Sequence, residues 1–213
     1  MNSKNLKVNT SEIIYWFNAL RNLPIEERTR ALDAFWAGQI DSKVWLVESL
    51  TNVDLPLNYN IYIFGGWIGI LASLLLQTDQ RIGKIRSIDL DPWCEEVADM
   101  ICKPHEMNGW RFKARTGNMM TYEYEWGIRP HVVINTSTEH VDQETYNAWY
   151  DSIPADTWVV AQGNDFFECE EHVRSTKDLE TFMQVNSVVD PIYAGSLPHD
   201  LYTRYMCIWK KNN

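Results

Sequence analysis

Two short segments of the sequence combine residue types that suit a nucleoside ligand. The glycine loop Gly65–Gly69 (Gly-Gly-Trp-Ile-Gly) follows the apolar run 61–64, and Asp89 lies at the end of the next apolar run. Glycine has no side chain and lets a ligand approach the backbone, while a carboxylate one strand away can accept hydrogen bonds from ribose hydroxyls. A glycine turn alone could also form without any ligand. The glycine loop together with Asp89 therefore predicts a cofactor-binding enzyme.

The residues that follow the fourth predicted strand include the candidate catalytic groups. Asn135 could hold an amine or a hydroxyl by its amide oxygen, and Glu139 or His140 could remove a proton, the imidazole being better matched to neutral pH. In the alternative interpretation, Thr136 or Ser137 caps a following helix and Glu139 lies in its first turn. Both interpretations can hold at once.

We expect no metal. Asn135, Asn164, Asp165 and His140 follow the fourth and fifth predicted strands and carry oxygen or nitrogen donors, but their spacing is too loose to predict a metal site. His172 follows the acidic pair Glu170 and Glu171 and is expected on a solvated helix face.

Strand and helix patterns alternate from residue 61 onward, which predicts a parallel sheet with crossover helices. Polar residues follow each strand, at the edge where open sheets of this kind bind ligands. We expect strands at 61–64, 85–90, 111–115, 131–135, 157–161, 188–193 and 201–209, and helices at 69–77, 92–102 and 177–185. Asp91 is expected to cap the helix that begins at Pro92. Three further helices are expected at the N-terminus, from an N-cap at Ser11 to Pro24, at 25–38 and at 41–50. The predicted domains are a helical cap at 1–55 and a sheet domain at 56–213.

The charge of the chain argues against a nucleic-acid partner. Residues 120–213 hold six basic and fifteen acidic side chains and so account for most of the net charge of −10. Tight nucleic-acid binding needs clustered Lys and Arg, and we therefore disfavour it.

The four cysteines form no CxxC pair, which fits a reduced cytoplasmic protein. The apolar run 61–76 is shorter than the roughly 20 residues of a membrane span, so no membrane association is expected.

Residues 61–210 resemble the class I S-adenosylmethionine-dependent methyltransferases in the segments FGGWIGILASLL, IRSIDLDP and INTSTEH. In particular, they resemble a group of methyltransferase-like proteins encoded by tailed phages, which would place the protein in the host cytoplasm. The resemblance implies a Rossmann-like, seven-stranded, mostly parallel sheet with a reversed C-terminal strand. It implies S-adenosylmethionine as the cofactor, with the ribose held by Asp89, the adenine flanked by Leu90 and its amino group met by Asn118. The implied cofactor-binding residues are Gly65, Gly66, Trp67, Gly69, Asp89, Leu90, Asn118 and Met119.

Three positions depart from the usual pattern of these enzymes. Ile63 stands two residues before the first glycine, and Asn118 stands at the adenine, where acids are common. Trp67 is bulky for a glycine loop and either stacks on the ligand or narrows the methionine channel. The expected function is methyl transfer to an unidentified small molecule or protein side chain.

Three alternatives to methyl transfer stay open. The first is another use of S-adenosylmethionine, such as aminocarboxypropyl transfer or cleavage of the cofactor. The second is a catalytically silent protein that engages a host partner through its acidic C-terminal half. Dinucleotide binding is less favoured than either, because Trp67 interrupts a GxGxxG motif.

Overall fold

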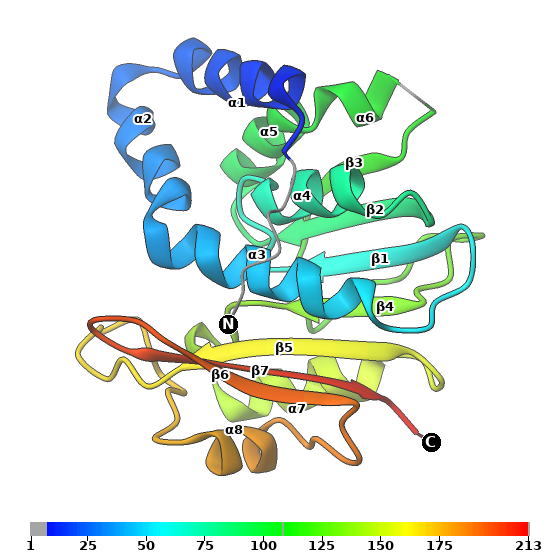
Figure 1. Ribbon diagram of the computed structural model, residues 1–213, viewed down its shortest axis with the longest axis vertical. Coiled ribbons are helices and arrows are strands. Elements are labelled where there is room, and N and C mark those ends of the chain that lie inside the picture. The colour runs from blue at the N-terminus through cyan, green and yellow to red at the C-terminus, as the bar shows by residue number, and fades with distance from the viewer. Residues whose placement is uncertain (1–7, 108, 213) are drawn as a thin grey trace. The chain divides into compact units, whose positions relative to one another are not determined.

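The computed structural model describes residues 8–107 and 109–212, in which helices and strands alternate along most of the chain (Figure 1). The helices are α1 (Thr10–Asn22), α2 (Ile25–Leu32), η1 (Asp33–Phe35), α3 (Ala37–Thr51), α4 (Ile70–Thr78), α5 (Pro92–Ile101), α6 (Lys103–Met107), η2 (Thr138–His140), α7 (Gln143–Ser152) and α8 (Leu179–Val185), where η marks a 3-10 helix. The strands are β1 (Tyr59–Phe64), β2 (Ile82–Asp89), β3 (Phe112–Thr116), β4 (Val132–Asn135), β5 (Trp158–Asn164), β6 (Tyr193–Pro198) and β7 (Thr203–Lys210). Among the described residues, no helix has both the length and the apolar character needed to cross a bilayer.

The strands form one seven-stranded sheet in the order β3-β2-β1-β4-β5-β7-β6. The pairs β1–β2, β2–β3 and β4–β5 are parallel, whereas β7 runs antiparallel to both β5 and β6. The predicted fold class is thereby confirmed, including the reversed C-terminal strand and the helices that precede the sheet. The chain also divides into two compact units, the first ending at Gly117 and the second beginning at Asn118. The division into a cap at 1–55 and a sheet domain at 56–213 stays a prediction.

The core of the first unit is built on β1 and α4. Ile61 to Phe64 are buried, and every residue from Ile70 to Leu76 is buried as well. A helix that is apolar on all sides needs cover on all sides, and α4 contacts β2, α3 and α5. The glycine loop joins β1 to α4, so both ends of this loop are anchored in the core.

The N-terminal helices differ from the predicted ones in their boundaries. Asn9, not Ser11, caps α1, because its Oδ1 accepts a hydrogen bond from the Ser11 N–H at 3.1 Å. The predicted helix 25–38 ends at Leu32 and continues only as η1. Trp36 then takes an extended conformation, with ψ of 145°, and α3 begins at Ala37. The break at Trp36 therefore moves the start of the third helix four residues upstream of its predicted position.

A buried polar network attaches α1 to the helices of the sheet layer. His105 Nε2 on α6 lies 3.0 Å from Glu12 Oε1. On α4, Ser73 Oγ lies 3.3 Å from Glu12 Oε2 and accepts a hydrogen bond from Trp16 Nε1 at 3.0 Å. Glu12, Ser73 and His105 are all buried. Because buried polar groups need partners, this network fixes which face of α1 packs inward.

A second buried network joins the end of α3 to the start of β2. Asp79 accepts hydrogen bonds from the Arg81 N–H, from both ends of the Arg81 guanidinium and from the Tyr59 hydroxyl. The same guanidinium donates to the Thr51, Val53 and Leu55 carbonyl groups. Burial raises the pKa of the Asp79 carboxyl, but the bonds from Arg81 outweigh burial and hold that pKa below its ordinary value.

We expect Asp79→Asn to lower the free energy of unfolding by about 2 to 3 kcal/mol at neutral pH, because charge-assisted hydrogen bonds are lost. The folded-state pKa of Asp79 is depressed, so its contribution is fully present above the unfolded pKa of about 3.9 and is lost as the pH falls through the folded value. Urea unfolding of both proteins between pH 7 and pH 3 measures this difference. If the difference in unfolding free energy between wild type and Asp79→Asn stays constant from pH 7 to pH 3, the ionised Asp79 carboxylate is not the source of the stabilisation.

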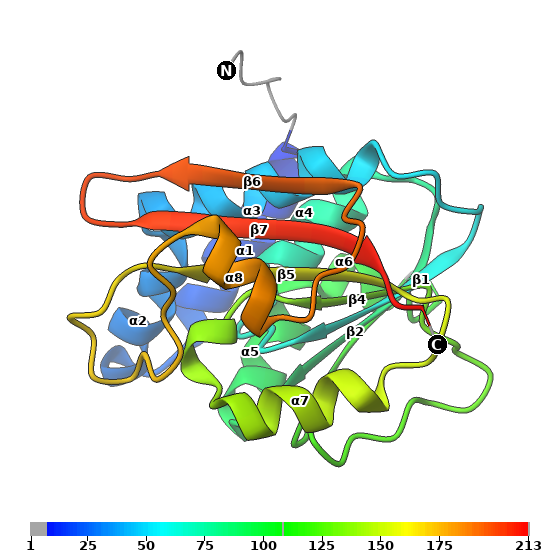
Figure 2. The same cartoon turned by 90° about the horizontal axis from the view of Figure 1, so that it is seen from below.

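The second unit is built on β4, β5 and β7, whose central residues are buried. The helix α7 packs against β7 through Tyr150, which stacks on Trp209 and accepts a hydrogen bond from its indole N–H. Figure 2 shows α7 and α8 within this unit, and α8 contacts both β6 and β7. We did not predict α7, because only Tyr146 and Trp149 of its residues are buried and so small a set gives a weak periodic signal.

Two predicted strands of this unit have the wrong boundaries. The fifth strand extends to Asn164, so Gln162, Gly163 and Asn164 lie inside β5 and do not follow it. The sixth strand begins at Tyr193, where the predicted one ended. It is an edge strand whose residues alternate between partly buried and exposed. It therefore has no continuous apolar run, which is the pattern that predicted the central strands.

Candidate functional site

The structure brings the glycine loop and Asp89 together, as predicted. Asp89 Oδ2 accepts a hydrogen bond from the Trp67 N–H at 2.9 Å, and Oδ1 accepts one from the Asp91 N–H at 3.2 Å. The Gly66 N–H donates to the Ile88 carbonyl at 3.2 Å. The carboxyl end of β2 therefore holds the loop that follows β1 in a defined shape.

Backbone geometry accounts for the glycines of this loop. Gly65 and Gly69 have φ angles of 65° and 80°, in the left-handed region that favours glycine. A Cβ atom on Gly66 would lie 1.9 Å from Ser87 Oγ on β2. These requirements hold without a ligand, so the glycine pattern alone does not identify a cofactor. Trp67 also has a positive φ, of 48°, which is uncommon for a bulky residue and is typical of functional loops.

We expect Gly66→Ala to lower the free energy of unfolding by about 1 to 3 kcal/mol, because the new methyl group overlaps Ser87 Oγ. In a Ser87→Ala background the same change should cost less, since the nearest remaining atom is the residue 87 Cβ at 3.2 Å. A double-mutant cycle followed by thermal unfolding measures this coupling. Equal costs in the two backgrounds would show that Ser87 does not determine the glycine.

Residues next to Asp89 have structural roles. Asp91 caps α5, as predicted, because its Oδ1 accepts a hydrogen bond from the Trp93 N–H at 2.9 Å. Hydrogen bonding to Arg30 lowers the pKa of Asp91 and keeps it ionised. Burial, with the negative charge of Asp89 second, raises the pKa of the Cys94 thiol to about 12. Cys94 is therefore a neutral thiol and not a nucleophile at neutral pH.

In the second unit, Asn118 is exposed and its Oδ1 accepts a hydrogen bond from the Met120 N–H at 2.9 Å. Met119 is partly buried. Asn135 ends β4 with 1% of its surface exposed, and its Oδ1 accepts a hydrogen bond from the Ser137 N–H at 2.9 Å. The two asparagine side chains therefore shape the turns that follow them.

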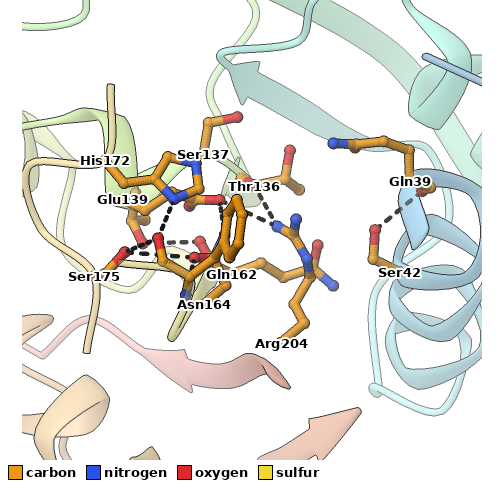
Figure 3. Close-up of polar contacts among 12 residues, drawn as sticks. Gln39, Ser42, Thr136, Ser137, Glu139, Gln162, Asn164, His172, Ser175 and Arg204 are labelled. Carbon is orange, nitrogen blue, oxygen red and sulfur yellow. Dashed lines mark hydrogen bonds and ion pairs between the residues drawn. The ribbon is translucent and has the colours of Figure 1, made fainter. Parts of the chain in front are cut away.

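Glu139 is buried and ion-paired. Its Oε1 accepts a hydrogen bond from Asn164 Nδ2 at 2.6 Å and lies 3.4 Å from Arg204 Nη1 (Figure 3). Only 3% of Glu139 and 4% of Arg204 is exposed. Removing one partner of such a pair leaves a buried charge without compensation, so the pair holds η2 against β5 and β7.

The predicted capping role for Thr136 or Ser137 is wrong. The segment forms only the short η2, and Ser137 at its N-cap position makes no side-chain capping bond. Thr138 Oγ1 instead donates to the Gln162 carbonyl at 2.8 Å. The next α-helix, α7, begins later and is capped by Asp142. The glutamate is therefore committed to tertiary partners and not to a capping box.

The expectation for His172 is also wrong, because this residue lies outside any helix and is partly buried. Its ring meets the His140 ring edge to face, with centroids 4.6 Å apart. The sequence offered no local signal for this contact, because 31 residues separate the two histidines.

The four residues considered as metal ligands from the sequence, Asn135, Asn164, Asp165 and His140, do not all point to a common site. Asn164 and Asp165 are occupied within the chain: Asn164 Oδ1 accepts a hydrogen bond from the Phe166 N–H, and Asp165 binds the Thr203 N–H and the Tyr205 hydroxyl. The ion pair between Arg204 and Glu139 was not predicted, and the available signal for it was a charged residue directly before the run 205–209.

Comparisons with known proteins identify the fold of the chain. No family model and no curated protein matches the chain. Among solved structures, N-methyltransferase NodS from Bradyrhizobium japonicum WM9 in complex with S-adenosyl-l-homocysteine matches with a TM-score of 0.65 and 11% identity, over 93% of this chain and 99% of that one. Geranyl diphosphate methyltransferase in complex with SAM matches with a TM-score of 0.60 and 14% identity, over 92% of this chain and 94% of that one. The pyocyanin biosynthetic protein PhzM matches with a TM-score of 0.63 and 14% identity, over 91% of this chain and 61% of that one.

The chain has the class I methyltransferase fold. Sequence identities of 11–14% are too low to carry over a substrate or a reaction. The first unit holds the glycine loop and Asp89. The second unit holds Asn135 and η2.

Proposed function

We propose that this protein is an S-adenosylmethionine-dependent methyltransferase. The observation that carries the proposal is Asp89, at the carboxyl end of β2, bonded to the backbone of the glycine loop after β1. An ionised carboxylate has about four lone-pair positions. The backbone N–H groups of Trp67 and Asp91 use two of them, and the Cys94 thiol, a weak donor, uses a third. One ribose hydroxyl could take the remaining position without disturbing the loop, and a second could replace the thiol.

We assign the methionine portion of the cofactor to the glycine loop and the adenine to residues that follow β2 and β3. Gly65, Gly66 and Gly69 would line the methionine portion, and Trp67 would flank it. Leu90 has 71% of its surface exposed, an apolar area that an adenine ring would cover. Asn118 and Met119 complete the proposed adenine contacts.

The reaction needs alignment more than activation. A lone pair of the acceptor attacks the methyl carbon as the carbon–sulfur bond breaks, and the bonding electrons return to the sulfonium sulfur to leave S-adenosylhomocysteine. The protein has to hold donor and acceptor in line and accept a proton where the acceptor carries one. We propose Asn135 for orienting the acceptor and, in the metal-free protein, His140 for taking the proton, since Glu139 is already paired with Arg204.

Isothermal titration tests the cofactor assignment. We expect S-adenosylmethionine and S-adenosylhomocysteine to bind and NAD not to bind. Failure of all three would overturn the enzyme proposal, and tighter binding of NAD would replace the cofactor. Incubating cell extracts with methyl-labelled cofactor and the protein, followed by mass spectrometry, would then identify a small-molecule or side-chain acceptor.

A second use of the same cofactor is favoured by Trp67, whose positive φ sets a bulky ring within the glycine loop. Aminocarboxypropyl transfer releases methylthioadenosine, whereas methyl transfer releases S-adenosylhomocysteine. Chromatography of the spent cofactor separates these products and decides between the two reactions.

A further inference from the structure

Glu139, His140 and His172 form a compact cluster of metal-binding side chains in the second unit. Each residue offers one ligand atom, and the three atoms lie within 4.8 Å of one another. Glu139 and His140 come from η2, and His172 comes from the segment between β5 and α8. Figure 3 shows the His172 ring beside Glu139.

The Glu139 carboxylate has one oxygen left over. Asn164 and Arg204 both approach Oε1, whereas Oε2 is buried and has no hydrogen-bond partner among the described residues. A buried carboxylate oxygen without a partner is costly, so such an atom in a native fold calls for an explanation. A cation held between Glu139 and the two histidines would provide the missing partner.

The surroundings of the cluster orient its ligands. His172 Nδ1 lies 2.8 Å from the Phe166 carbonyl oxygen, which can only accept, so Nδ1 carries the hydrogen and donates it. Nε2 of the same ring then keeps its lone pair. Metal-binding histidines are held in this way, with one ring nitrogen donating to a carbonyl or carboxylate. Asn164 and Arg204 similarly fix the orientation of Glu139 (Figure 3).

We propose that Glu139, His140 and His172 bind a divalent transition-metal ion, represented by Zn²⁺. Two imidazoles and one carboxylate suit zinc and its neighbours in the first transition row, whereas magnesium and calcium prefer oxygen ligands throughout. Three protein ligands leave at least one coordination position for water or for an oxygen or nitrogen atom of a ligand. From the sequence, no metal was expected; the cluster of Glu139, His140 and His172 is the observation from which we propose one.

A bound ion would change the role proposed for His140. Coordination occupies the lone pair with which His140 would accept a proton, so one imidazole cannot serve both roles. The metal proposal does not depend on S-adenosylmethionine, and it can be tested with the metal alone.

The test uses the full chain, freed of metal by a chelator and titrated with Zn²⁺ by calorimetry. We expect one ion per chain, at least tenfold weaker binding by His172→Ala, and unchanged binding by the matched control His131→Ala, which alters a histidine that precedes β4. Circular dichroism establishes that each variant is folded, and Glu139→Gln should also weaken binding. Equal affinity of wild type and His172→Ala, or absence of binding, would overturn the proposal.

Spectroscopy with Co²⁺ identifies the ligand atoms. We expect visible ligand-field bands in the wild-type protein that His172→Ala reduces. An intense near-ultraviolet band from sulfur would put the ion on a thiolate such as Cys169 and overturn the assignment. Equally strong binding of Mg²⁺ would contradict a site with two imidazole ligands.

Discussion

Asp89→Asn should weaken S-adenosylmethionine binding by about 2 to 4 kcal/mol, because charge-assisted hydrogen bonds to two ribose hydroxyls are lost. This corresponds to a rise in Kd of roughly 30-fold to several hundred-fold. Asparagine has the same shape as aspartate and keeps one carbonyl oxygen for the Trp67 N–H, while its amide nitrogen loses the hydrogen bond from the Asp91 N–H. The substitution therefore leaves the glycine loop in place while removing the charge. Isothermal titration of both proteins gives the ratio of Kd values.

Asp91→Asn is the matched control, since Asp91 lies two residues away on the same chain segment. Its carboxylate caps α5 and pairs with Arg30, so its loss should lower stability but change the Kd by less than about threefold. If both variants weaken binding equally, the ribose assignment to Asp89 is wrong. If neither does, the proposed pocket is wrong, whereas the metal cluster of the second unit is unaffected.

Arg174→Met should lower the free energy of unfolding by about 2 to 4 kcal/mol, as expected when a partly buried cation with several hydrogen bonds is removed. The guanidinium donates to the carbonyl groups of Thr138, Val141 and Val185 and to Asn186 Oδ1. Methionine fills much of the same volume but leaves these acceptors without their donor. Urea unfolding measures the loss.

Two further contacts add to the role of Arg174. Its backbone N–H donates to the Glu139 carbonyl at 3.0 Å, and its guanidinium lies 3.9 Å from the centre of the Tyr146 ring. Burial lowers the pKa of Arg174, but an arginine keeps its charge at neutral pH. Arg174 therefore joins η2, α7 and the end of α8.

Lys177→Met is the control for Arg174→Met. The Lys177 side chain is 75% exposed, and its Nζ lies 3.7 Å from Asp178 Oδ2 in an exposed ion pair. We expect a change within about 0.5 kcal/mol, as for other surface substitutions. A loss from Lys177→Met comparable to that from Arg174→Met would show that the general loss of positive charge, and not the buried contacts, governs stability.

The alternation of strands and helices and the first half of the candidate site follow from short-range patterns. Apolar runs of strand length, the glycine turn after Phe64 and the acid at the end of β2 are local features, and parallel strands bring their carboxyl ends to one edge of a sheet. Asp91 could be predicted as a cap for the same reason, because a cap and its helix are adjacent in sequence. The boundaries of β6 and the presence of α7 were missed where the buried residues are too sparse to make a periodic pattern.

By itself, the amino-acid sequence determined the fold class and the pairing of the glycine loop with Asp89. Only the tertiary structure decided why Gly66 must be glycine, which partner holds Glu139, and that His172 meets His140. The physical reason is that these contacts join segments far apart in sequence. Side chains of Ser87, Arg204 and His172 reach their partners only after strands and loops have packed, so no local spacing encodes the contacts.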